Sequence, residues 1–157
     1  MKSIKETLVL PSAAMRMALD ALVRHSKRTD FAINMYTFGD VAPNGLCMGC
    51  MATCAIQEVA DFCFHPGDEI HYESQRANLT GLDEDEMGAF ETAIDAYRQG
   101  DARYLYHFFG AGVAIADELR DAGVAQLTDG VSMDNDNWQE HLPAFYAFAD
   151  RVAAAGY

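Results

Sequence analysis

Three of the four cysteines in this chain of 157 residues stand close together. They are Cys47, Cys50 and Cys54, in the stretch GLCMGCMATCAIQ at residues 45–57. A deprotonated thiol is a nucleophile and a soft metal ligand, whereas a protonated thiol packs like a small hydrophobic group. The cysteines could therefore carry out redox chemistry, bind a metal or fill part of a core.

The residues around these cysteines predict a helix over 46–64. This segment contains no proline and a single glycine, Asn44 or Gly45 could cap its start, and Pro66 with Gly67 would end it. On such a helix, positions i, i+3 and i+7 share one face. Because cysteine is among the most frequently buried residue types, our first interpretation is that the three thiols form a packing face of small residues.

The second interpretation is a thiol-dependent redox protein. Cys47 and Cys50 form a C-x-x-C, and Cys47 would lie in the first turn of the expected helix. Unpaired backbone N–H groups and the helix dipole stabilise a thiolate there, and residues three apart can form a disulfide after a small adjustment. In this alternative Cys47 and Cys50 are the catalytic residues, and Cys54 is a possible third thiol.

The C-x-x-C motif resembles that of the alkylhydroperoxidase-D-like family, whose members are all-helical thiol enzymes. In that family a histidine follows the motif, and Cys54 stands at the corresponding position here. The resemblance covers four positions at most. It implies that an all-helical fold can host a C-x-x-C, and no activity is carried over from it.

A metal or iron–sulfur site is the third interpretation. Cys47, Cys50 and Cys54 offer three thiolates, and Cys63 or His65 could be a fourth ligand. On one continuous helix, however, Cys47 and Cys54 would be about 10 Å apart along the axis. Because one ion cannot bridge that distance, we expect no metal ligand and no cofactor.

The remaining residues form no recognisable catalytic motif. None of the five histidines stands in an H-x3-H or H-E-x-x-H pattern, and the chain has no phosphate-binding loop, dinucleotide fingerprint or G-x-S-x-G sequence. An aromatic run around His107 indicates a packed core histidine, whereas His65 and His71 could approach the thiols. The sequence therefore argues against an enzyme, with a thiol oxidoreductase as the enzymatic alternative.

The sequence pattern predicts helices along almost the whole chain, including the segments that hold these residues. Apolar residues recur at helical spacing, and glycine or proline ends most of the periodic segments. The expected helices cover residues 11–28, 46–64, 68–79, 82–100, 102–110, 113–123 and 142–156. Residues 31–38 alternate apolar and polar side chains but have no obvious partner strand, so we interpret them as an extended loop.

This pattern predicts an all-α fold. We expect one domain over residues 1–157, a compact bundle of five to seven helices with little or no sheet, in which about ten N-terminal residues form a loose arm. Neighbouring helices would be joined by short connections.

Charge and hydropathy limit the classes of partner. The formal net charge is −13, with +3 on residues 1–30 and −16 on the rest. This balance argues against nucleic-acid binding, because phosphate contacts need a positive surface. No apolar run approaches the roughly 20 residues of a membrane span, and the N-terminus shows no secretory signal, so we expect a cytoplasmic protein without membrane contact.

The function expected from these observations is that of a small acidic protein that binds another protein without catalysing a reaction. An acidic surface attracts basic partners, and a large net charge also keeps a protein soluble without any part in binding. The partner expected for a binding role is a basic protein, with self-association as the other possibility.

Overall fold

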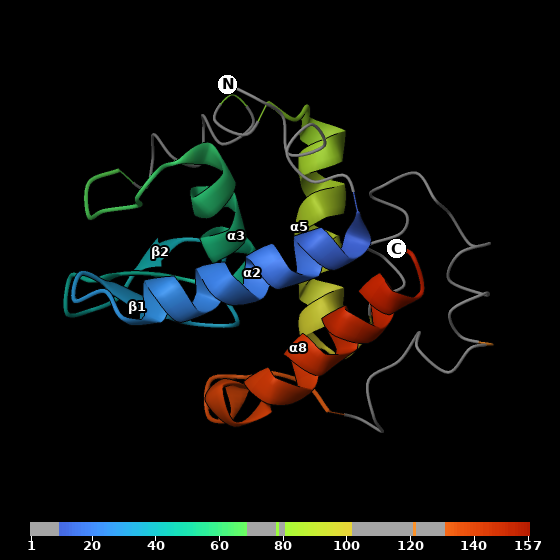
Figure 1. Ribbon diagram of the computed structural model, residues 1–157. Helices are drawn as coiled ribbons and strands as arrows, with labels where there is room; N and C mark the ends of the chain where they lie inside the picture. Colours follow the sequence, from blue (N-terminus) through green and yellow to red (C-terminus); the bar gives the residue numbers. More distant parts are fainter. Residues whose placement is uncertain (1–9, 69–77, 79–80, 102–120, 122–130) are drawn as a thin grey trace.

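The computed structural model describes residues 10–68, 78, 81–101, 121 and 131–157 (Figure 1). Within these residues the chain forms four α-helices and a three-stranded sheet, in the order α2, β1, β2, β3, α3, α5, α8. The predicted all-α bundle is therefore wrong, and the described structure is a mixed α/β fold. The N-terminal arm, the helix predicted at 102–110 and almost all of those at 68–79 and 113–123 lie outside the described residues.

Helix α2 spans Pro11–Ser26, close to the helix predicted over 11–28. Pro11 occupies its first turn, where the missing N–H would have no helical partner in any case. Met15, Leu19 and Leu22 recur every three or four residues and are fully buried. With this face α2 packs against both α3 and α8, and it occupies the centre of Figure 1.

The sheet joins three short strands that the sequence pattern does not predict. β1 (Phe31–Ile33) pairs in parallel with β3 (Cys47–Gly49), and β2 (Asp40–Val41) pairs antiparallel with the other edge of β3. The interpretation of residues 31–38 as a loop is wrong for β1. Its partner strand is β3, which lies at the start of the segment predicted as a helix over 46–64. Strands of two or three residues are too short to show a period of two.

Helix α3 spans Met51–Ala60, so it is shorter at both ends than the predicted helix over 46–64. Cys50 has an extended backbone at the N-cap, and its N–H donates to Thr53 Oγ1 at 3.2 Å. Gly49 leaves room for this turn, since a Cβ on residue 49 would lie 2.6 Å from Thr53 Cγ2. The close approach of Thr53 to the backbone of β3 therefore fixes where the strand ends and the helix begins.

Helix α5 spans Glu84–Arg98, as the sequence predicts. The Asp83 carboxylate caps the helix by accepting a hydrogen bond from the Glu86 N–H at 2.8 Å. Phe90 and Ile94 lie one turn apart and are fully buried. The opposite side of the helix carries polar and acidic residues, some of which reach the site described below.

Helix α8 spans Trp138–Ala154 and begins before the predicted residue 142. Pro143 consequently lies inside the helix rather than in its first turn. The Tyr97 hydroxyl donates to the Phe145 carbonyl at 2.9 Å and so connects α5 to α8. Figure 1 shows the end of α8 beside the start of α2, where Ser12 Oγ donates to the carbonyl oxygen of Tyr157 at 2.6 Å.

The four described helices differ from membrane-spanning helices. None of the helices in this part of the chain combines the length and the apolar character needed to cross a bilayer.

Candidate functional site

The four cysteines lie in different environments, and none forms a disulfide. Cys47 on β3 and Cys54 on α3 are fully buried. Cys50, between the two elements, is partly exposed, and Cys63 is exposed. The predicted row of three thiols along one helix is wrong, because α3 begins only after Cys50.

Burial makes Cys47 and Cys54 less accessible to reagents than Cys50 and Cys63. Cys47 and Cys54 belong to the hydrophobic core. Desolvation raises the pKa of Cys54 well above its usual value, and the nearby Cys50 thiol raises it further. A thiol with a raised pKa is a poor nucleophile at neutral pH. The position at the start of a helix, which the sequence predicts for Cys47, belongs to Cys50.

Among the described residues, the cysteines do not come together with other ligands of a metal ion. Cys47 lies on a strand, so a separation of about 10 Å along a single helix axis does not apply to it. His65 Nδ1 lies 2.8 Å from Asp30 Oδ2, and Cys63 is exposed. In the part of the chain that the structure describes, no group of three or more Cys, His, Asp and Glu residues is arranged to hold an ion.

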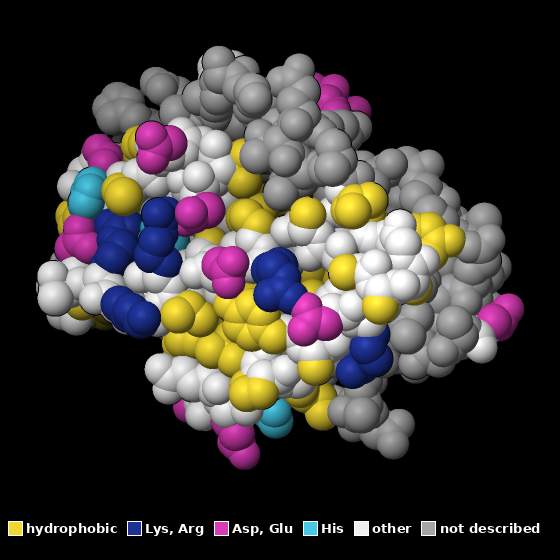
Figure 2. Space-filling model, in the orientation of Figure 1, with side chains coloured by type: hydrophobic (Ala, Val, Ile, Leu, Met, Phe, Trp, Pro, Cys, Tyr) yellow, Lys and Arg dark blue, Asp and Glu magenta, His cyan; other side chains and the backbone are white. Residues whose placement is uncertain are grey.

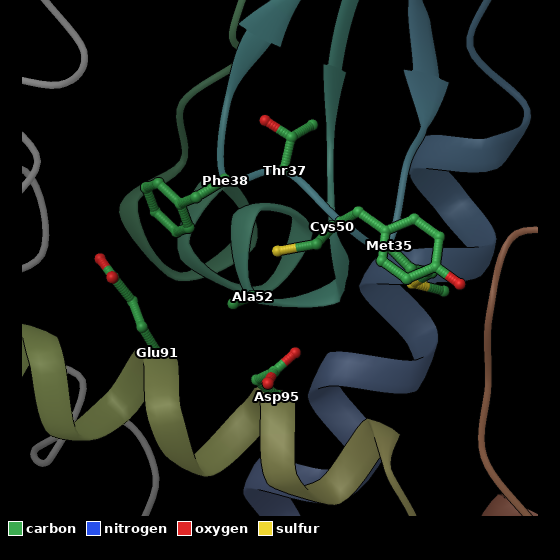
Figure 3. Close-up of a pocket in the computed structure, with 8 residues that line it drawn as sticks. Met35, Thr37, Phe38, Cys50, Ala52, Glu91 and Asp95 are labelled. Atoms are coloured by element: carbon green, nitrogen blue, oxygen red, sulfur yellow. The ribbon is translucent and has the colours of Figure 1, made fainter.

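Cys50 faces a pocket of about 210 Å³ between the loop after β1 and helix α5 (Figure 3). The lining residues are Met35, Tyr36, Thr37, Phe38, Cys50, Ala52, Glu91 and Asp95. In Figure 3 the side chains of Glu91 and Asp95 rise from α5 on one side, and Phe38 and Cys50 lie on the other. A largely apolar wall therefore faces two acidic side chains.

Asp95 is held in place by Arg98, one turn further along α5. Arg98 Nε and Nη2 both donate to Asp95 Oδ1, at 3.1 and 2.9 Å, and Arg98 Nη1 donates to the Met133 carbonyl at 2.9 Å. Arg98 is buried, whereas the Asp95 side chain is 56% exposed. The ion pair thus orients an accessible carboxylate from a buried anchor.

Tyr36 lines the same pocket with 72% of its surface exposed. Its backbone is held firmly: the Tyr36 N–H donates to Asn34 Oδ1 at 3.0 Å, and the Met35 N–H donates to Asn135 Oδ1 at 2.7 Å. The Arg98 guanidinium lies 5.8 Å from the centroid of the Tyr36 ring. An anchored backbone therefore presents an aromatic ring to solvent beside the acidic side chains.

A second polar cluster lies near the C-terminal ends of α2 and α3. Arg28 donates to Gln57 Oε1 at 3.1 Å and to Asp30 Oδ1 at 2.9 Å, and its Nη1 lies 3.1 Å from His25 Nδ1. Burial, assisted by the positive charges of Arg28 and Arg24, lowers the pKa of His25 from 6.5 to about 4. Neutral His25 and charged Arg28 therefore coexist, and the cluster ties the two helix ends together.

The face of the molecule over α2 carries charges of both signs. Figure 2 shows Lys and Arg side chains next to Asp and Glu side chains on this face. Two ion pairs start from α2, Arg16 with Asp150 and Arg24 with Glu58. Because opposite charges at short range cancel one another's field, this face offers no extended surface of one sign.

Sequence patterns identify Cys50 but not its surroundings. Tyr36 belongs to the segment interpreted as a loop, and no pattern marks it as exposed. Asp95 and Arg98 stand at i and i+3, a spacing typical of ion pairs on helices, and this is the one signal the sequence offers for the anchored carboxylate. That α5 faces the cysteine segment is a long-range contact, which no local pattern encodes.

The described residues thus define a small mixed α/β protein with an acid-lined pocket at the start of a helix. No protein-family model, no curated protein and no solved structure matches the chain. The pocket beside Cys50 and the net charge of −13 are the features of this chain that bear on its function.

Proposed function

We propose that this protein is a non-enzymatic interaction module that binds a basic segment of a partner protein at the pocket beside Cys50. One observation carries the proposal: Glu91 and Asp95 face an apolar wall, and the exposed ring of Tyr36 stands at the same pocket. Carboxylates bind ammonium and guanidinium groups, and aromatic rings bind them through their faces. The net charge of −13 adds long-range attraction of basic proteins.

The size of the pocket supports a protein side chain as the occupant. A volume of about 210 Å³ is smaller than the roughly 300–1,000 Å³ of sites for drug-sized molecules. A single long side chain needs less space, and the surrounding surface supplies the rest of a protein interface. A binding module that anchors one residue of its partner fits this pocket better than an enzyme that encloses a substrate.

A basic partner is favoured over self-association. Two copies of the chain each carry −13, and like charges facing each other across an interface repel. Among the described residues, the exposed large hydrophobic side chains are Leu10 and Tyr36. These two side chains alone supply less apolar surface than a stable homodimer buries, so they do not offset the repulsion between two copies.

Calorimetric titration of the full chain with short synthetic peptides tests the proposal. We expect a peptide that alternates glycine with lysine and arginine to bind, and its affinity to fall as salt is raised, because exposed charges are screened. A peptide of the same length with glutamate in place of the basic residues is the control. Equal binding of the two peptides, or binding of neither, contradicts the proposal.

A thiol-dependent redox function is the second proposal, and the partial exposure of Cys50 at the start of α3 supports it. The Cys50 thiolate would attack a small-molecule disulfide. One sulfur of the reagent would form a mixed disulfide with Cys50, and the other would leave as a thiolate. Cys47 and Cys54 are fully buried, so either would need a local opening before it could resolve the mixed disulfide.

Labelling of the native protein with iodoacetamide, followed by mass mapping, tests the thiol proposal. Cys63 is the internal control, because it is exposed and lies after the end of α3, not at the first turn of a helix. Faster labelling of Cys50 than of Cys63 is the expected result, because backbone N–H groups at a helix start stabilise a thiolate. If Cys50 reacts no faster than Cys63 over the whole pH range, its position does not activate it.

A further inference from the structure

We infer that the pocket selects a lysine side chain over an arginine side chain of the basic partner. This inference rests on the proposed function and names the residue type that the pocket recognises. It is carried by the way in which Arg98 holds Asp95 on α5.

Asp95 offers one oxygen, not two, to an incoming cation. Its Oδ1 already accepts hydrogen bonds from Nε and Nη2 of Arg98, at 3.1 and 2.9 Å. A guanidinium group binds a carboxylate best through two parallel N–H···O bonds, one to each oxygen. An ammonium group is a compact charge that needs a single oxygen. The remaining oxygen, Oδ2, therefore suits lysine and cannot complete the paired geometry that arginine prefers.

Arg98 is fixed and does not give up Oδ1 easily. The side chain is buried, and its Nη1 also donates to the Met133 carbonyl at 2.9 Å. The backbone N–H of Met133 in turn donates to the Arg98 carbonyl at 2.8 Å. Moving the guanidinium aside would break charge-assisted hydrogen bonds to Asp95 and to a buried carbonyl. An arginine of the partner therefore cannot bind both oxygens of Asp95, because Oδ1 already accepts two hydrogen bonds from Arg98.

Carboxylate oxygens still line the pocket. Arg98 offsets the charge of Asp95 but leaves its Oδ2 as an acceptor, and Glu91, one turn earlier on α5, brings a second carboxylate to the same wall. The net charge of −13 supplies the long-range attraction of a cation. In Figure 3 the side chains of Glu91 and Asp95 point to the same side of α5, toward the pocket. The ring of Tyr36 provides a further surface for a positive charge.

The apolar wall matches the stem of lysine. Met35, Phe38 and Ala52 line the pocket opposite the acidic side chains. Lysine buries its methylene groups along apolar surface and places its charge at the end of the chain. A lysine that lies along this wall carries its ammonium group to the carboxylates of α5.

Two peptides that differ only in lysine or arginine, each alternating with glycine, test the inference with the full chain. We expect the lysine peptide to bind the wild-type protein about tenfold more tightly, measured by calorimetry. Asp95→Asn should bring the ratio close to one, because the amide keeps the acceptor for Arg98 but replaces Oδ2 by a donor. Asp85→Asn, with the same charge change at an exposed position of α5 outside the pocket, should preserve the ratio.

The outcomes separate this inference from the proposed function. Equal affinities of the two peptides for the wild-type protein overturn the lysine preference and leave the interaction module standing. Binding of neither peptide overturns both. A lysine preference that survives unchanged in folded Asp95→Asn overturns the role of Asp95. The wild-type comparison needs no variant, so it is decisive even if a variant fails to fold.

Discussion

The guanidinium group of Arg28 donates a hydrogen bond to the side-chain oxygen of Gln57 at 3.1 Å, and so joins the end of α2 to α3. The same side chain donates to the Phe64 carbonyl at 3.0 Å and to Asp30 Oδ1 at 2.9 Å. Gln57 is fully buried. One arginine therefore fixes the relative position of two helices, and α3 is the helix that begins at Cys50.

Replacing Arg28 by methionine should destabilise the fold. Hydrogen bonds to a buried amide and to a backbone carbonyl are lost together, and we expect the free energy of unfolding to fall by about 2–4 kcal/mol. Urea unfolding followed by circular dichroism measures it. Lys27→Met is the matched control, with the same charge change at the neighbouring residue, and should shift stability by less than about 0.5 kcal/mol. Similar losses in both variants would show that charge alone, and not the cluster, is responsible.

The low pKa of His25 predicts a loss of stability in mild acid. Folding lowers this pKa from 6.5 to about 4, chiefly by burial, so the unfolded chain binds a proton that the folded chain does not. Above pH 6.5 His25 is neutral in both states, and the free energy of unfolding has its full value. As the pH falls toward 4, proton uptake by the unfolded chain lowers the free energy of unfolding by up to about 3 kcal/mol.

The difference in unfolding free energy between the wild-type protein and His25→Gln, measured from pH 4 to 8, isolates this effect. The difference should be constant above pH 7. Below pH 6.5 the wild-type protein should lose stability relative to the variant as the pH falls, because the variant lacks the titrating group. His141→Gln, on α8, serves as the control for loss of a histidine elsewhere. A difference that does not vary with pH would contradict a depressed pKa at His25.

Gly49 and Gly88 should respond in opposite directions to alanine. A Cβ at residue 49 would lie 2.6 Å from Thr53 Cγ2, so Gly49→Ala should destabilise the protein by about 1–3 kcal/mol. A Cβ at residue 88, inside α5, meets nothing within 4 Å, and Gly88→Ala should stabilise by about 0.5–1 kcal/mol. Thermal unfolding of the two variants makes the comparison. If Gly49→Ala leaves the thermal stability unchanged, the junction of β3 and α3 can shift to accommodate the extra methyl group.

The sequence predicts the long helices of the described structure well, because their periodic apolar faces and end signals are local. Pro11 marks the start of α2, and Asp83 caps α5 where the acidic run predicts it. The helix expected over 46–64 is wrong at its start. A run rich in Ala, Met and Cys favours helix, yet residues 47–49 pair with two other strands instead. Pairing between segments distant in sequence outweighs local propensity there.

The candidate site carries weaker local sequence signals than the long helices do. Cys50 is recognisable from the sequence by its residue type, but the C-x-x-C spacing suggests Cys47 as the helix-start thiol. Because α3 begins at Met51, Cys50 and not Cys47 lies at the start of the helix. The ends of a helix are less well defined by a local pattern than its middle. Tyr36 and Asp95 reach the pocket from two other elements, and only the tertiary packing of α5 against α3 brings them to Cys50.

Alkylation of Cys50 should close the pocket to a basic peptide. A carboxamidomethyl group on Cys50 would occupy part of a space of about 210 Å³, so the affinity for the lysine peptide should fall about tenfold or more. The experiment uses Cys63→Ser, which removes the other accessible thiol, whereas burial protects Cys47 and Cys54 in the native protein. Mass mapping confirms the site of labelling.

The matched control is the double variant Cys50→Ser, Cys63→Ser, treated with the same reagent. Serine keeps the size of the side chain but is not alkylated by iodoacetamide, so this protein should bind the peptide as the untreated Cys63→Ser variant does. A loss of binding that requires the Cys50 thiol ties the peptide to the pocket, because the labelled atom lies in its wall. Undiminished binding by the fully labelled protein would place the basic partner on another surface.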